Sequence, residues 1–338
     1  MGKIKGLRDY LEQSSLKDVL EIPKEERVVC KELAQGEYNI NYVFQHPVTK
    51  KKMVLRVNTG SQMHLFNQIQ YEFDALEFLK ESGRTPRPFY VDASKKLLDY
   101  GVMVMEFLEG RSLNYKTDLS LGAECLADIH SVPILGRKGF LSPLNPLQAI
   151  LDECHTMVQT YYNSPLGNIK IKKQIEKMLK YGEEKLVSKG VYTGYHCCIN
   201  TELNSGNFLI NGYGKSNYLV DWEKPLLGNP VQDLGHFLAP TTTFWKTDII
   251  LSQKEIDEFV QAYLIAVDGR FLIENLKEQL ELFISITCLR GITWCAMAWV
   301  QYQEPGRLIR NQNTFHKLEA YLDEDFLVHI ERQYLKKI

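Results

Sequence analysis

The residues with the clearest chemical potential lie between positions 200 and 223. Asn207 follows Glu202 by five residues, and Asp221 follows Asn207 by fourteen. In phosphoryl transfer, a carboxylate accepts the proton of the acceptor hydroxyl, and an amide five residues later binds Mg²⁺. A second carboxylate bridges the metal to the β- and γ-phosphates. The spacing therefore predicts Asn207 and Asp221 as metal ligands and Glu202, with them, as the catalytic group.

Glu202 departs from the residue usual at its position, which is Asp, and Asn200 stands two residues earlier where His is usual. A displacement of about 1 Å can cost on the order of 10²-fold in rate. Proton removal is nevertheless weakly demanding in a loose transition state. Two interpretations stay open: an active enzyme with Glu202 as the catalytic carboxylate, or a silent protein that binds nucleotide without turnover. Retention of both metal-binding positions favours the active enzyme.

Longer segments resemble the aminoglycoside phosphotransferase and choline kinase-like superfamily. The chain reads Asp-Trp-Glu from Asp221, Gly-Asn-Pro from Gly228 and Asp-Leu from Asp233. The superfamily pattern is Asp-Trp/Phe-Glu, Gly-Asp-Pro and Asp-Leu, with its outer Asp residues twelve apart, as here. Segment 126–130, Leu-Ala-Asp-Ile-His, is similar to the superfamily's Leu-Ala-x-Leu-His signature, and segment 103–110 is similar to its hinge. The matches follow the superfamily's order over most of the chain.

This resemblance implies a Mg²⁺-dependent phosphotransferase that moves the γ-phosphate of ATP or GTP to a hydroxyl of a small molecule. It implies an α+β fold of the bilobal protein kinase type. The small β-rich lobe is expected at 1–108 and the large helical lobe, with the catalytic loop and acceptor site, at 109–338. Only eleven residues separate Asp221 from Asp233, whereas a protein kinase has a long activation segment there. The acceptor is therefore expected to be a small molecule rather than a protein.

Arg56 lies on a predicted strand, at the position where kinases place a Lys that reaches the α- and β-phosphates. Arg keeps the charge and adds a planar fork of donors. Glu72, on the following predicted helix, is expected to pair with Arg56, and Glu77 is the rival partner. The structural alternative is an exposed strand Arg beside a surface Glu.

Two further segments are candidates for nucleotide contact. Gly36 and Asn39 lie in a predicted hairpin loop whose backbone N–H groups could cover the phosphates. The resembling superfamily often carries Gly with a nearby Asn here, but a single glycine also fits an ordinary β-turn. Glu106 to Leu108 should present backbone groups to adenine.

Other residues are candidates for supporting roles. Asp233 should accept N–H groups of the catalytic loop or cap its own helix. His130 is expected to pack inside the helical lobe, and Glu223 faces either metal or acceptor. Segment 196–198, His-Cys-Cys, lacks a second ligand pair at zinc spacing and is expected to form the strand before the catalytic loop. Three tryptophans could line an acceptor pocket but fit core packing better: Trp222, Trp245 and Trp294.

Segment 248–282 holds eight acidic residues against three basic ones. Acidic surface near the site would attract a cationic acceptor. A solvated helix face explains the same composition.

The elements that must position these residues follow from periodicity. Strand patterns occupy about 27–33, 38–45, 52–57, 88–92 and 101–106, after an amphipathic lead-in helix within 1–25. A helix is expected at about 62–82. Beyond 108 the expected helices are 118–131, 145–163, 168–188, 230–238, 252–266, 270–302 and 311–334, with two short strands within 200–221.

Composition limits the partners and the setting. The formal net charge is −2, which does not favour nucleic acid as the main partner. Seven cysteines without a C-x-x-C pair favour a reducing, cytoplasmic setting. The apolar run 282–302 carries Arg290 in its middle and predicts a buried core helix rather than a membrane span. The oligomeric state stays open.

Overall fold

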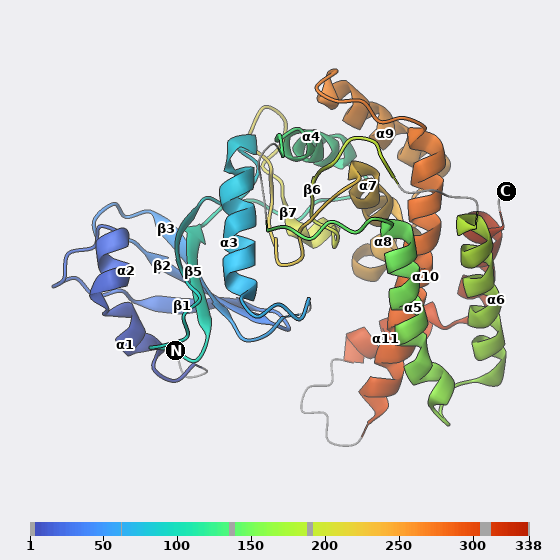
Figure 1. The fold of residues 1–338 in the computed structure, drawn as a ribbon, viewed down its shortest axis with the longest axis horizontal. Coiled ribbons are helices and arrows are strands. Elements are labelled where there is room, and N and C mark those ends of the chain that lie inside the picture. The colour runs from blue at the N-terminus through green and yellow to red at the C-terminus, as the bar shows by residue number, and fades with distance from the viewer. Residues whose placement is uncertain (1–3, 62, 135–138, 188–191, 305–311, 337–338) are drawn as a thin grey trace. The chain divides into compact units, whose positions relative to one another are not determined.

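The computed structural model describes residues 4–61, 63–134, 139–187, 192–304 and 312–336 (Figure 1). Helices and antiparallel strands are both present, so the expected α+β class is confirmed. The chain divides into two compact units. The first contains Met1–Leu113, Asp118–Phe140 and Asn207–Pro225, and the second contains Asn114–Thr117, Leu141–Gly206 and Leu226–Ile338. The functional division into lobes 1–108 and 109–338 stays a prediction.

A five-stranded antiparallel sheet forms the centre of the first unit, in the order β1-β2-β3-β5-β4. Its strands are β1 (Cys30–Gln35), β2 (Asn39–Gln45), β3 (Lys52–Asn58), β4 (Pro88–Asp92) and β5 (Gly101–Glu106). Both β4 and β5 have the bounds expected from the sequence. On the central strand β3, Arg56 is opposite Asn41 on one side and Met103 on the other.

Successive side chains of β3 point to opposite faces of the sheet. Leu55 and Val57 belong to a core cluster with residues of α1 (Leu7–Leu11) and α2 (Ser14–Val19). Arg56, between them, therefore points to the opposite face, where α3 (Gln68–Leu79) lies (Figure 1).

Two local differences from expectation occur around this sheet. The single lead-in helix is in fact α1 and α2, separated at Gln13, whose backbone is extended. Helix α3 begins at Gln68 rather than near residue 62, and a 3₁₀ turn at Lys80–Ser82 completes it. The described residues before α3 form turns, and His64 there has a left-handed backbone.

The rest of the first unit includes a helix and a two-stranded ribbon. It contains α4 (Leu119–His130) and a two-stranded ribbon of β7 (Phe208–Leu209) and β8 (Tyr218–Leu219). His130 is fully buried, which confirms its expected packing role.

Helices dominate the second unit. They are α5 (Pro146–Asn163), α6 (Ile169–Leu186), α7 (Pro230–Leu238), α8 (Pro240–Thr247), α9 (Gln253–Val267), α10 (Leu276–Gln303), α11 (Gln312–Tyr321) and α12 (Glu324–Ile330). Strands β6 (Cys197–Ile199) and β9 (Leu226–Gly228) pair beside them.

This unit differs from expectation at both ends of helices and in two additional elements. Helix α10 begins at Leu276 instead of near 270, and α8 and β9 were not expected. The single helix at 311–334 is α11, α12 and a π-helical turn at Glu331–Leu335. A new helix starts within it because the Asp323 carboxylate caps α12, accepting from the N–H groups of Asp325 and Phe326.

Helix α10 runs through the core of the second unit and packs against α5, α7, α8 and α11. Its length and apolar composition would allow a membrane crossing, but 72% of its most apolar window is buried inside the protein. The expectation of a buried core helix is therefore confirmed. Gly235 of α7 permits close packing here, since an added Cβ would overlap the Cβ of Phe283 and lie 3.1 Å from its backbone carbonyl carbon.

Replacing Gly235 with Ala should lower the free energy of unfolding by about 1–3 kcal/mol, as overpacking does in a core. Gly182→Ala, in helix α6, is the control because the nearest atoms to its new methyl are the movable side-chain ends of Leu289, Ile286 and Leu151. Urea unfolding should show the larger loss for Gly235→Ala. Equal losses, or a more stable Gly235→Ala, would contradict this packing.

Candidate active site

A buried ion pair between Arg56 and Glu72 is the centre of the first unit's polar cluster. The Nη1 of Arg56 donates to the Glu72 carboxylate, and its Nε donates to Oδ1 of Asn41 at 3.0 Å. The exposed fractions of Arg56 and Glu72 are 6% and 1%. Nη1 also lies 3.5 Å from Oδ1 of Asp221. The structure thus brings together three residues that were predicted from positions far apart in the sequence.

Glu77, the rival partner, is excluded by its own contact. It pairs with Lys80 at 2.8 Å on the partly exposed surface of the first unit. The alternative of an exposed strand Arg is also wrong, because Arg56 is buried.

Burial and the charge of the partner shift the pKa of each member of this pair in opposite directions. Burial raises the pKa of Glu72 to about 7, although Arg56 lowers it, and Asp221 raises it further. Burial lowers the pKa of Arg56, but the charges of Glu72, Asp221 and Glu223 outweigh this and raise it. One guanidinium therefore faces three carboxyl groups. Within the described chain, Oε2 of Glu72 is buried without a hydrogen-bonding partner.

The β7–β8 ribbon brings the two predicted metal ligands to one end. Phe208 pairs with Leu219, and the N–H of Val220 donates to the carbonyl of Asn207 at 2.8 Å. Asn207 and Asp221 therefore flank the same end of the ribbon. Asp221 has a φ of 68°, a left-handed conformation that few non-glycine residues adopt. Its partly exposed carboxylate and the Asn207 amide offer the hard oxygen ligands that Mg²⁺ prefers.

Glu223 is held by contacts within the first unit, and whether it faces metal or acceptor stays a prediction. Its Oε2 accepts a hydrogen bond from Nδ2 of Asn39 at 2.5 Å, and its backbone carbonyl accepts one from Gln68. The next turn is held by Tyr71, whose hydroxyl donates to the carbonyl of Pro225 at 2.7 Å. These contacts attach the segment after Asp221 to β2 and α3.

The predicted phosphate loop is a short closed turn. The N–H of Gly36 donates to the carbonyl of Asn39 at 2.9 Å, and Nδ2 of Asn58 donates to Oδ1 of Asn39. Asn39 thus links the loop to Asn58 and Glu223. An added Cβ at Gly36 would meet only the Asn39 carbonyl oxygen, at 3.8 Å, so this position does not require glycine for space. Phosphate contact by Gly36 and Asn39 stays a prediction.

Glu106 and Leu108 lie at the end of β5 and just after it. The N–H of Glu106 already donates to the carbonyl of Arg87 at 2.8 Å. Contact of this segment with adenine stays a prediction.

In the second unit, Asp233 holds the start of the catalytic loop. Its two carboxylate oxygens accept the N–H groups of Asn200 and Thr201, each at 2.7 Å. Its expected support of the loop is confirmed, while Asn229 is the residue that caps α7. Oδ1 of Asn200 accepts the N–H of Glu202 at 3.2 Å. The Asn that replaces the usual His therefore helps to fix the backbone of Glu202.

The side chain of Glu202 pairs with Arg290 of α10, with Oε1 3.0 Å from Nη2. Arg290 also pairs with Glu153 of α5, its Nε 2.9 Å from Oε2. Burial lowers the pKa of Arg290, but Glu153 and Glu202 outweigh burial and raise it. Neither Arg290 nor Glu153 was predicted as a site residue. The available signal was an Arg inside an apolar run, because a buried charge needs a partner.

Comparison with known proteins identifies the family. The model of the phosphotransferase enzyme family matches residues 29–276. The chain belongs to this family. Among curated protein sequences, none shows significant similarity to it. The suspected superfamily is thus confirmed by the family model.

Solved structures with the same fold include a spectinomycin phosphotransferase in complex with ADP and spectinomycin. It is 14% identical, with a TM-score of 0.63, over 91% of this chain and 93% of its own. Choline kinase from Cryptosporidium parvum Iowa II is 11% identical, with a TM-score of 0.64, over 90% and 89%. A microcompartment-associated aminopropanol kinase is 16% identical, with a TM-score of 0.63, over 92% and 93%. The predicted protein kinase-like fold is confirmed.

The cysteines beside the catalytic loop of this phosphotransferase-family chain are structural. Cys197 and Cys198 lie in β6, fully buried, as expected for the strand before the loop. Burial, with Asp233 nearby, raises the pKa of both thiols. Among the described residues, no three His, Cys, Asp or Glu side chains are grouped to hold a metal ion. Mg²⁺ sites commonly use one or two protein carboxylates and the substrate's phosphates.

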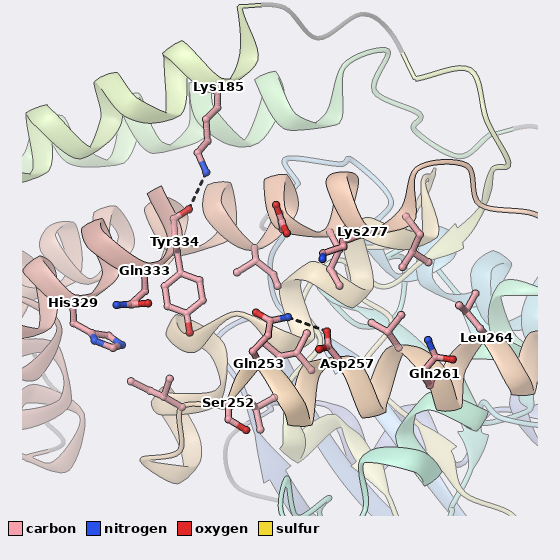
Figure 2. A pocket seen from close by; sticks show the side chains of 18 residues that line it. Lys185, Ser252, Gln253, Asp257, Gln261, Leu264, Lys277, His329, Gln333 and Tyr334 are labelled. Atoms are coloured by element: carbon pink, nitrogen blue, oxygen red, sulfur yellow. Dashed lines mark hydrogen bonds between the residues drawn. The ribbon is translucent and has the colours of Figure 1, made fainter. Parts of the chain in front are cut away.

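A cavity of about 900 Å³ lies within the second unit, along α9 and the first turns of α10 (Figure 2). In this view Lys185 donates to the carbonyl of Tyr334, and Gln253 donates to Asp257. None of the predicted site residues lines it. Its charged lining balances two acids against two lysines, so the acidic segment 248–282 does not create an acidic pocket here. The charged lining residues are Lys185, Asp257, Lys277 and Glu281.

The Arg56–Glu72 contact should matter for nucleotide binding. Glu72→Gln should weaken ATP affinity in the presence of Mg²⁺ by about tenfold, equivalent to about 1.4 kcal/mol, because Arg56 loses its orienting charge. Thermal shift titrations measure this effect, since a bound ligand stabilises the native state. Glu77→Gln, on the same helix, should leave the affinity unchanged.

The double variant Arg56→Gln/Glu72→Gln should lose less affinity than the sum of the single variants, because the two residues are in contact. Fully additive losses, or an equal loss in Glu77→Gln, would contradict the pairing role.

Proposed function

We propose that this chain is a Mg²⁺-dependent kinase that transfers the γ-phosphoryl group of ATP or GTP to a hydroxyl of a small molecule. The observation that carries the proposal is the cluster of Arg56, Glu72 and Asp221, with Asn207 at the same end of the ribbon as Asp221. It lies within the part of the chain that matches the phosphotransferase family.

The first unit would hold the phosphoryl donor. Arg56, oriented by Glu72, would contact the phosphates, and its Nη2 is not used in the contacts with Asn41, Glu72 and Asp221. Asn207 and Asp221 would hold Mg²⁺, which supplies charge neutralisation at the β- and γ-phosphate oxygens. Carboxylate and amide oxygens such as those of Asp221 and Asn207 are the ligands that Mg²⁺ prefers.

Glu202 would act on the acceptor. The acceptor oxygen forms a bond to the γ-phosphorus as the bond to the leaving diphosphate oxygen breaks, and the hydroxyl proton passes to the Glu202 carboxylate. Pairing with Arg290 weakens a carboxylate as a base. The loose transition state makes this tolerable, because the proton leaves late and orientation of the hydroxyl matters more.

The acceptor would be a small hydroxylated molecule, with a cationic amine as the first class to test. The structural neighbours are named for spectinomycin, choline and aminopropanol. Near Glu202, Arg290 pairs with two carboxylates, those of Glu153 and Glu202.

We also propose a reducing, cytoplasmic setting. All seven cysteines are buried and free of disulfides, which is the usual state of thiols in the cytosol.

A catalytically silent nucleotide-binding protein is the second candidate. The observation that favours it is the ion pair that engages Glu202. Turnover separates the two, because the silent protein would bind nucleotide and transfer nothing.

Glu202→Gln keeps the size of the side chain but removes its charge. Transfer should fall by about 10²–10⁴-fold, the usual range for loss of a general base, while ATP affinity stays the same. The assay follows nucleotide consumption and acceptor phosphorylation with choline, ethanolamine, aminopropanol and spectinomycin, each with ATP and GTP. Undiminished transfer by Glu202→Gln would contradict its role. Nucleotide binding without transfer by the wild type would favour the silent protein.

A further inference from the structure

We propose that Arg290 is the positioning residue for the Glu202 carboxylate, and that Glu153 holds Arg290 in place. The inference rests on the proposed function, since it concerns the group that would receive the acceptor's proton. It gives a physical reason for a Glu at a position where Asp is usual.

The three side chains come from separate elements of the second unit. Glu153 lies on α5, Glu202 in the catalytic loop and Arg290 on α10, which packs against α5. Nε and Nη2 of Arg290 face the two oxygens of Glu153, at 2.9 and 3.4 Å. Nη2 also donates to Oε1 of Glu202 at 3.0 Å. A planar guanidinium held by one carboxylate thus presents a donor in a fixed direction to the other.

The surroundings of Arg290 keep its position defined. Only 17% of its side chain is exposed, and its neighbours on α10, Leu289 and Ile292, are buried. A largely buried guanidinium that pairs with two carboxylates would lose charge-assisted hydrogen bonds if it moved. Glu202 is 29% exposed. Its carboxylate is therefore fixed from the protein side and still accessible.

The length of Glu202 matches this arrangement. An Asp at position 202 would set the carboxylate back by about one C–C bond, so the 3.0 Å contact with Arg290 would stretch beyond hydrogen-bonding distance. An unpaired Glu would have an additional rotatable bond to order. The contact with Arg290 removes this freedom, and an error of about 1 Å in placing such a group can cost on the order of 10²-fold.

Hydrogen bonds to the backbone around Glu202 also help to position its side chain. Asp233 holds the N–H groups of Asn200 and Thr201, and Asn200 accepts from the N–H of Glu202. These bonds fix the start of the Glu202 side chain, and Arg290 fixes its end. Glu202 would then keep its negative charge and have a fixed orientation, because Arg290 also pairs with Glu153.

The test compares Arg290→Ala, Arg290→Lys and Glu202→Asp with the wild type, measuring kcat, the KM for ATP and ATP binding. The probe reactions are the phosphorylation of choline, ethanolamine, aminopropanol and spectinomycin, with hydrolysis of ATP alone as the background reaction. We expect kcat of Arg290→Ala to fall by about 10²-fold with an unchanged KM for ATP. Added guanidinium should restore part of kcat, which a merely structural role would not explain.

Arg290→Lys provides a second variant if Arg290→Ala does not fold. Lys keeps the charge but has no planar fork, so kcat should fall at least about tenfold, the equivalent of about 1.4 kcal/mol. The double variant Arg290→Lys/Glu202→Asp should lose less than the sum of its single variants.

Arg84→Lys is the matched control. Arg84 pairs with Asp128 at 2.8 Å in the first unit, and the exposed fractions are 19% and 30%, against 17% and 29% for Arg290 and Glu202. Its kcat should equal that of the wild type.

Two outcomes separate failure of the inference from failure of the proposed function. If the wild type transfers phosphate but the Arg290 variants keep its kcat, or fall no more than Arg84→Lys, the positioning role is wrong and the kinase function stands. If the folded wild type binds ATP but neither phosphorylates a probe nor hydrolyses ATP, the proposed function is wrong, and the inference falls with it.

Discussion

The burial of Arg56 is the constraint on which the donor-binding part of this protein depends. A guanidinium inside a sheet-and-helix core must be paired, because an unpaired buried charge is strongly destabilising. Strand alternation gives Leu55 and Val57 to the core with α1 and α2, so Arg56 must face α3. Helix α3 meets it with Glu72. The same guanidinium lies near Asp221, and this links the central strand of the sheet to the ribbon that presents the predicted metal ligands.

The second unit also contains an arginine that pairs with carboxylates from separate elements. Arg290 is a largely buried guanidinium shared by Glu153 and Glu202, on a helix that packs mostly in the core. Backbone donors of the catalytic loop meet the buried carboxylate of Asp233. In each unit, then, a buried charged group fixes residues that the family resemblance associates with phosphoryl transfer. Removing Glu72 would leave the buried guanidinium of Arg56 without its closest carboxylate, so binding geometry and stability are coupled at this position.

Sequence patterns predicted the local and motif-based parts of this arrangement. The alternation of apolar residues predicted the bounds of β4 and β5 correctly. The motifs predicted that Arg56 pairs with Glu72 and that Asp233 accepts backbone N–H groups of the catalytic loop. The contacts missed are those between distant positions that no local pattern relates. Glu223 and Asn39 are 184 residues apart, and Arg290 and Glu202 are 88 apart. Helix ends were also misplaced, since α3 and α10 begin six residues later than expected. Turns and caps set such ends, and they are only weakly encoded by apolar periodicity.

The most direct test of the account is Mg²⁺-dependent transfer of labelled γ-phosphate from ATP to the small amines and spectinomycin, in wild type and Asp221→Asn. The account predicts labelled acceptor from the wild type with Mg²⁺, none with excess EDTA, and a loss on the order of 10²-fold or more in Asp221→Asn, because one oriented charge at the phosphates is removed. Equal transfer by both proteins, or transfer that persists in EDTA, would contradict it.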